Sequence, residues 1–270
     1  MSAEMRRLLR PDFNFCVPLY VLLGFCEDYK RVVINARHEL ILIRAHNDNN
    51  CLMEDPATEP TLELFKVQWR MPHVLLSEIN KLSMLRALES ERYLSMAFHS
   101  WDLYEFPLLQ SQPNIRGPSR RLLEKPRYVI FAMQTGRKNV MSEDVSRFDC
   151  KLTNAKLYLN SECHPYDLNL DFDKNRCAIL LYDLYARFCK SYYGYEYLEP
   201  SLTFTIFLRN IPFVIIDCSR QNESVKSGTV DMRLDFECKE NVLANTTVYC
   251  LIHDRMVQYN PLTNVVGKII

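Results

Sequence analysis

The sequence predicts a mainly β protein with a few inserted helices, and three observations support this prediction. In TVDMRLDFEC, residues 229–238, apolar and charged side chains alternate, as they do in a strand with one buried face. Fifteen tyrosines and fourteen phenylalanines supply the broad side chains that sheets favour. No internal repeat with a period of about 20 to 50 residues is visible, which argues against solenoids and propellers.

The strand at residues 229–238 also gives the predicted core residues. Its charged side chains fall on one face of a period-two pattern, and its apolar side chains fall on the other. We predict that the apolar set forms one wall of the protein core: Val230, Met232, Leu234, Phe236 and Cys238.

The N-terminal part of the chain predicts two helices and some strands. Residues 17–29 are typical of a short buried helix that ends near Gly24. Aliphatic and β-branched residues predict one long or two short strands at 31–45, and a further strand at 64–70. A helix is predicted at 75–90, with one apolar stripe: Leu75, Ile79, Leu82, Leu85 and Leu88.

Strands dominate the rest of the chain. They are predicted at 92–106, 126–134, 150–162 and 212–218, with loops at 111–125 and 239–246. The second loop joins the strand at 229–238 to an antiparallel partner at 247–259. A helix is predicted at 173–194, capped by Asp173 or Asn175 and stopped by Gly194.

The charge pattern gives no reason to expect a nucleic-acid or membrane partner. The 33 basic residues balance the 33 acidic residues, so no global field attracts a polyanion. One local cluster is basic: Arg116, Arg120, Arg121, Lys125 and Arg127. A solvated loop is the favoured interpretation of this cluster, and a polyanion contact is the alternative.

The cysteines predict an intracellular protein. None of the ten forms a C-x-x-C pair, and several occupy apolar positions, as buried free thiols do in a reducing compartment. Secretion is the alternative, because Arg6, Arg7 and Arg10 precede an apolar run at 15–26, as in a signal peptide. The run lacks a small-residue cleavage site and is too short to span a bilayer.

The search for chemistry predicts no catalytic, cofactor-binding or metal-binding residues. The nucleophile elbow, the phosphate loops and the H-E-x-x-H motif are all absent. Asp171, Asp173 and Asn175 imitate a calcium loop, but Arg176 stands where a glycine is needed, so a helix start is the favoured interpretation. Cys163 beside His164 leaves a weak alternative, a thiol enzyme.

Several long phrases resemble a known family. Among them are FCVPLYVLLGFCEDYKRVVINARHELILIRA, EKPRYVIFAMQTGRKN and VIIDCSRQNESVKSGTVDMRLDFECKENVLANTT. From about residue 13 to residue 266, the chain resembles the double jelly-roll-like domain proteins of invertebrate genomes. That family looks like the major capsid proteins of Polinton-type elements and related DNA viruses. The resemblance implies two eight-stranded sandwiches per subunit, trimers, and neither enzymatic activity nor a cofactor.

The resemblance sharpens the fold class to a jelly-roll β-sandwich with a few inserted helices. A chain of 270 residues is too short for two sandwiches beside those helices, so the first jelly roll is expected to be truncated. We expect the remnant of its end at 13–70, a connecting helix at 71–90, and a second jelly-roll domain at 91–270.

These expectations combine into one functional hypothesis and one alternative. The hypothesis is a non-enzymatic structural protein resembling the C-terminal part of a double jelly-roll major capsid protein, derived from an integrated viral or transposon-like element. Its partner would be itself, as a homotrimer in a capsid-type lattice. The alternative is a domesticated β-sandwich interaction module that binds a protein or a glycan.

Overall fold

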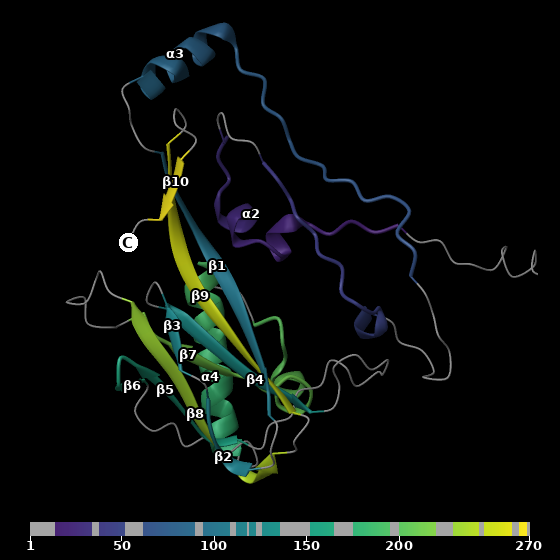
Figure 1. Ribbon diagram of the computed structural model, residues 1–270, viewed down its shortest axis with the longest axis vertical. Coiled ribbons are helices and arrows are strands. Elements are labelled where there is room, and N and C mark those ends of the chain that lie inside the picture. The colour runs from purple at the N-terminus through teal and green to yellow at the C-terminus, as the bar shows by residue number, and fades with distance from the viewer. Residues whose placement is uncertain are drawn as a thin grey trace, which may run out of the picture.

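The computed structural model describes most of the chain (Figure 1). The described residues are 14–33, 38–51, 62–89, 94–108, 112–117, 119–122, 126–135, 152–164, 175–194, 200–219, 229–242, 246–260 and 265–268.

The strands form two antiparallel sheets of five strands each. Sheet A has the order β1 (Leu94–Pro107), β9 (Thr246–Asn260), β4 (Tyr128–Thr135) and β7 (Val214–Asp217), and β10 (Val265–Lys268) also pairs with β9. Sheet B has the order β2 (Gln112–Arg116), β8 (Val230–Val242), β5 (Leu152–Leu159) and β6 (Glu162–His164), and β3 (Arg120–Leu122) also pairs with β8.

β2 and β3 act as one interrupted strand, because they pair with successive parts of β8. The interruption contains Gly117, whose N–H donates to the carbonyl oxygen of Leu234 over 2.7 Å. A Cβ at Gly117 would overlap that oxygen, so this close approach requires glycine.

With β2 and β3 counted together, the pairing is that of a jelly roll. The first strand pairs with the last (β1 with β9), the second with the second-last (β2 and β3 with β8), and so on inward to β4 with β7 and β5 with β6. A long antiparallel hairpin that is wrapped into two sheets gives this order. The predicted fold class, a jelly-roll β-sandwich with inserted helices, is therefore confirmed.

The core lies between the two sheets. The rings of Phe131 in β4 and Phe236 in β8 meet across it, with centroids 4.9 Å apart. β8 alternates between buried and more exposed positions. The structure places on its inner face, each 1% to 6% exposed, the side chains of Val230, Met232, Leu234, Phe236 and Cys238.

Helix α4 (Asn175–Tyr193) covers the other face of sheet A, so β4 is buried on both sides. The ring of Phe188 packs edge-on against Tyr128 of β4, with centroids 4.9 Å apart. The hydroxyl groups of Tyr128 and Ser191 are hydrogen-bonded over 2.6 Å. α4 ends at Gly194, which has a φ of 69°, as predicted. The short α5 (Phe204–Arg209) packs on α4.

The N-terminal elements differ from the prediction. The helix expected at 17–29 is divided into a 3-10 turn, η1 (Leu19–Val21), and α2 (Gly24–Asp28), neither of which has a buried residue. A second 3-10 turn, η2, spans Asn49–Cys51, and α3 spans Glu78–Glu89. Gly24 begins α2 and does not end it.

The strands predicted at 31–45 and 64–70 are absent from the described residues of those ranges. Their β propensity was real, but a strand also needs a partner strand, and no described strand lies next to them. The assignment of 13–70 to a first jelly roll stays a prediction.

Two predicted loops and one predicted pairing were wrong. Residues 111–125 contain β2 and β3, which were missed because each turns few apolar residues inward, Ile115 in β2 and Leu122 in β3. β8 continues to Val242, well into the loop expected at 239–246. β8 and β9 do not pair with each other, because the chain crosses from sheet B to sheet A between them.

Candidate assembly surface

The structure gives no support for a thiol enzyme at Cys163 and His164. They are consecutive residues of β6, paired with Tyr158 and Leu157 of β5. Successive positions in a strand face opposite sides of the sheet, so the two do not share a site. Within the described ranges, no group of three His, Cys, Asp or Glu residues could hold a metal ion.

The calcium-like stretch is not a described site. Asp171 and Asp173 lie outside the described residues, and Asn175 is the first residue of α4, one position inside the helix that it was expected to cap.

The described arginines of the predicted basic cluster have different neighbours. Arg121 Nε lies 3.4 Å from the carboxylate of Asp231. Arg116 is paired with Asp235 in the register of β2 and β8. The guanidinium of Arg127 lies over the ring of Tyr128, at 5.6 Å from its centroid. Lys125 and the side chain of Arg120 lie outside the described residues. The polyanion contact stays an alternative prediction.

The outer face of sheet B carries a shallow hollow of about 230 Å³. Its lining includes both signs of charge, in Arg116, Lys156, Asp235 and Glu237. The side-chain oxygen of Asn154 is buried there and has no hydrogen-bond partner among the described residues. This mixture selects no single ligand class by charge.

The most unusual surface belongs to the N-terminal segment. We call the described residues between 14 and 89 the arm. The arm holds most of the exposed large apolar side chains of the described chain, including Ile43 at 90% exposure, Phe65 at 81% and Leu75 at 98%. α3 begins after Leu75, and of the apolar stripe predicted for this helix only Leu88 is buried. An apolar surface of this extent is typical of an interaction surface.

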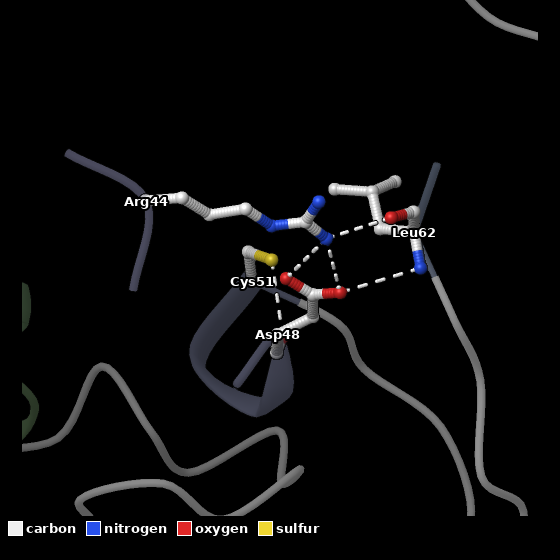
Figure 2. A network of polar contacts seen from close by, with 4 residues as sticks. All are labelled: Arg44, Asp48, Cys51 and Leu62. Atoms are coloured by element: carbon white, nitrogen blue, oxygen red, sulfur yellow. Dashed lines mark hydrogen bonds and ion pairs between the residues drawn. The ribbon is translucent and has the colours of Figure 1, made fainter. Parts of the chain in front are cut away.

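The arm has a fixed turn of its own. Figure 2 shows Arg44, Asp48, Cys51 and Leu62 in one polar network. Arg44 donates to both carboxylate oxygens of Asp48, at 3.0 and 2.8 Å, and to the carbonyl oxygen of Leu62 at 2.7 Å. The backbone N–H of Leu62 donates back to Asp48 over 3.3 Å. These bonds hold residues 44–51 against residue 62.

The arm is joined to the jelly roll at α2, which lies beside β1 (Figure 1). One carboxylate oxygen of Asp28 accepts from both the backbone N–H and the ring Nδ1 of His99, each over 2.7 Å. Gly24 packs on the carbonyl oxygen of His99, where a Cβ would overlap that oxygen. The register of β1 shifts between Met96 and His99, so the contact falls on a β-bulge.

Aromatic side chains complete this contact. Phe25 packs edge-on against Phe98, with centroids 5.1 Å apart. The hydroxyl of Tyr192 in α4 accepts from Trp101 Nε1 at 3.1 Å and donates to the carboxylate of Glu27 at 2.9 Å. Burial is the main cause that raises the pKa of Tyr192, and the nearby carboxylates raise it further. The hydroxyl therefore keeps its proton and stays a donor. We call this contact the α2 dock.

The cysteines whose side chains the structure describes are free thiols. Cys16 and Cys51 are exposed, whereas Cys189, Cys218 and Cys250 are buried. Burial raises the pKa of the Cys218 thiol to about 12, so this thiol is unreactive at neutral pH.

Comparison with known families identifies the protein class. The model of the double jelly roll-like domain matches residues 6–257. The chain belongs to this family. The double jelly roll-like domain family has a capsid-type structural fold, which agrees with the resemblance found in the sequence.

A solved structure gives a weaker likeness. The chain matches a protein chain in the 3.5 Å cryo-EM structure of the Sputnik virophage, with 9% identity and a TM-score of 0.43. The match covers 65% of this chain and only 39% of the virophage chain. No curated protein matches the sequence. Among the described helices, none is long and apolar enough to cross a membrane.

The α2 dock was not predicted from the sequence. Asp28 and His99 are 71 positions apart, and neither belongs to a periodic pattern. One feature of the sequence could have pointed to it: residues 24–28, G-F-C-E-D, carry an isolated glycine and two carboxylates. The prediction of a helix at 17–29 interpreted this glycine as the end of the helix.

Proposed function

We propose that the protein is a non-enzymatic structural protein that associates with itself through its arm. The subunits form capsid-type trimers that pack into a lattice. Family membership supports the structural role, and the exposed apolar surface of the arm is the observation that carries the self-association. Each large apolar side chain that is buried in a subunit contact contributes about 1.5 to 3 kcal/mol.

The rest of the hypothesis follows from the same proposal. The protein acts inside the cell, needs no cofactor, and has neither a sequence-specific nucleic-acid partner nor a membrane partner. It derives from an integrated viral or transposon-like element. The free thiols and the balanced charge support the intracellular setting and the absence of a polyanion partner.

Light scattering on a size-exclusion column tests the self-association. The wild-type chain is compared with a variant that carries Ile41→Asp, Ile43→Asp and Phe65→Asp, three exposed arm positions at which folding loses little. The control carries Ile179→Asp and Leu180→Asp, two exposed positions on α4. We expect trimers for the wild type and the control, and monomers for the arm variant. Trimers of the arm variant would contradict the assignment to the arm.

The alternative, a module that binds a protein or a glycan, is favoured by one observation. The hollow on sheet B contains the unsatisfied oxygen of Asn154, and a sugar hydroxyl is a suitable donor for it. Under this alternative the wild type is a monomer that binds glycans on an array. Asn154→Ala weakens that binding, whereas Asn114→Ala, in the lining of the same hollow, weakens it less.

A further inference from the structure

We propose that α2 of one subunit docks on β1 and α4 of a neighbouring copy, so that subunits exchange their arms. This inference rests on the proposed self-association and names the contact that holds the copies together. In the structure, α2 occupies the dock of its own chain.

The dock has two complementary halves that every copy carries. The plug is α2, with Gly24, Phe25, Glu27 and Asp28. The socket consists of residues of the jelly roll and α4: Phe98, His99, Trp101 and Tyr192. The plug of one copy therefore makes the same contacts with the socket of another copy as with its own. Identical contacts of this kind allow identical subunits to exchange an element.

The chain between the two halves is long, which weakens the preference for docking within one copy. It runs from residue 29 to residue 93. An extended chain spans about 3.3 Å per residue, so a link of this length can reach a neighbouring copy even with α3 folded. The effective concentration of a plug on such a link is on the order of millimolar at most. Neighbouring sockets in an assembly are present at a similar local concentration. Docking between copies therefore competes with docking within one copy.

The exposed part of the arm favours docking between copies. With α2 docked on its own chain, Ile41, Ile43 and Phe65 stay in water. The segment that leads to α3 runs apart from the two sheets in Figure 1. An arm that crosses to a neighbour passes along the surface of that neighbour, where these side chains can be buried. Burial of this apolar surface against the neighbour stabilises the exchanged arrangement.

Isotope-mixed photocrosslinking tests the exchange. Unlabelled and ¹⁵N-labelled chains both carry Phe25→p-benzoylphenylalanine, which places the reactive group in contact with Phe98. The unlabelled and labelled proteins are mixed in equal amounts as dissociated monomers. The mixture is allowed to associate and is then irradiated. Exchange predicts that about half of the crosslinks from position 25 to position 98 join a light to a heavy peptide. Crosslinks that join only like isotopes would overturn the proposal. Gly24→Val is the control, and it should lose the crosslink.

A complementation experiment gives an independent readout. One variant has a blocked plug, Gly24→Val, and the other a damaged socket, His99→Ala with Tyr192→Ala. In the mixture, the intact plug belongs to one variant and the intact socket to the other. An intact dock therefore forms only between two copies. We expect the mixture to associate at a concentration several-fold lower than either variant alone. Asp48→Ala is the matched control, because it removes a hydrogen-bonded carboxylate elsewhere in the arm.

The outcomes separate this inference from the proposed function. If the wild type forms trimers but the mixture gains nothing, the dock works within one chain and the exchange is wrong. If the wild type remains a monomer at every concentration, the proposed self-association fails, and the exchange fails with it.

Discussion

Truncation of Phe236 should cost more stability than any other single change on β8. Its side chain is 1% exposed, and its ring meets Phe131 across the two sheets at 4.9 Å. Phe236→Ala removes the buried ring and leaves a cavity, which costs about 3 to 5 kcal/mol in protein cores. The aromatic pair adds about 0.5 to 1.5 kcal/mol beyond the buried area. We therefore expect a loss at the upper end of the range.

Urea unfolding measured by circular dichroism checks this value. The matched control is Glu237→Ala, the next residue of the same strand, which faces solvent and should change the free energy of unfolding by less than about 0.5 kcal/mol. A double-mutant cycle with Phe131→Ala should give a coupling of at least about 0.5 kcal/mol. Equal losses for Phe236→Ala and Glu237→Ala, or no coupling, would show that the two sheets do not pack through this face.

Three further predictions follow from the dock and the thiols. Gly24→Val should make trypsin cleave after Lys30 and Arg31 several-fold faster, because a Cβ at position 24 overlaps the carbonyl oxygen of His99 and releases α2. Asp48→Ala, the control, should leave this cleavage rate unchanged. Burial raises the pKa of the Cys218 thiol from 9.0 in the unfolded chain to about 12 in the folded chain. Between these two values the unfolded chain releases a proton that the folded chain keeps. The free energy of unfolding should therefore fall as the pH rises from 9.0 towards 12. Urea titrations should show a shallower fall for Cys218→Ala, and an unchanged slope would contradict the burial of this thiol. Cys16 and Cys51 should react with Ellman's reagent within minutes, while Cys218, Cys238 and Cys250 should react only on unfolding.

The long strands and the main helix were predictable because each has a local pattern. β8 alternates with period two, and α4 has an apolar face and a glycine stop. Such signals lie within a dozen or so residues. The prediction failed where pairing decides the structure. Residues 64–70 have β propensity without a neighbouring strand, and Arg120–Leu122 forms a strand only because β8 lies beside it.

The candidate site was less predictable than the fold. The apolar side chains of the N-terminal part predicted a short buried helix at 17–29, strands at 31–45 and a helix with an apolar stripe at 75–90. In the structure most of these side chains are exposed. A sequence pattern shows that a surface is apolar, but it cannot show whether the covering surface belongs to the same chain or to another. The contact between Asp28 and His99 forms only in the folded chain, because 71 positions separate the two residues in the sequence.

The central claim is that this chain is a structural protein that associates with itself. Sedimentation velocity of the reduced protein across a hundredfold concentration range tests it most directly. The account predicts a discrete trimer that dissociates on dilution, with larger species at the highest concentrations. A folded monomer over the whole range would contradict the claim and favour the interaction module.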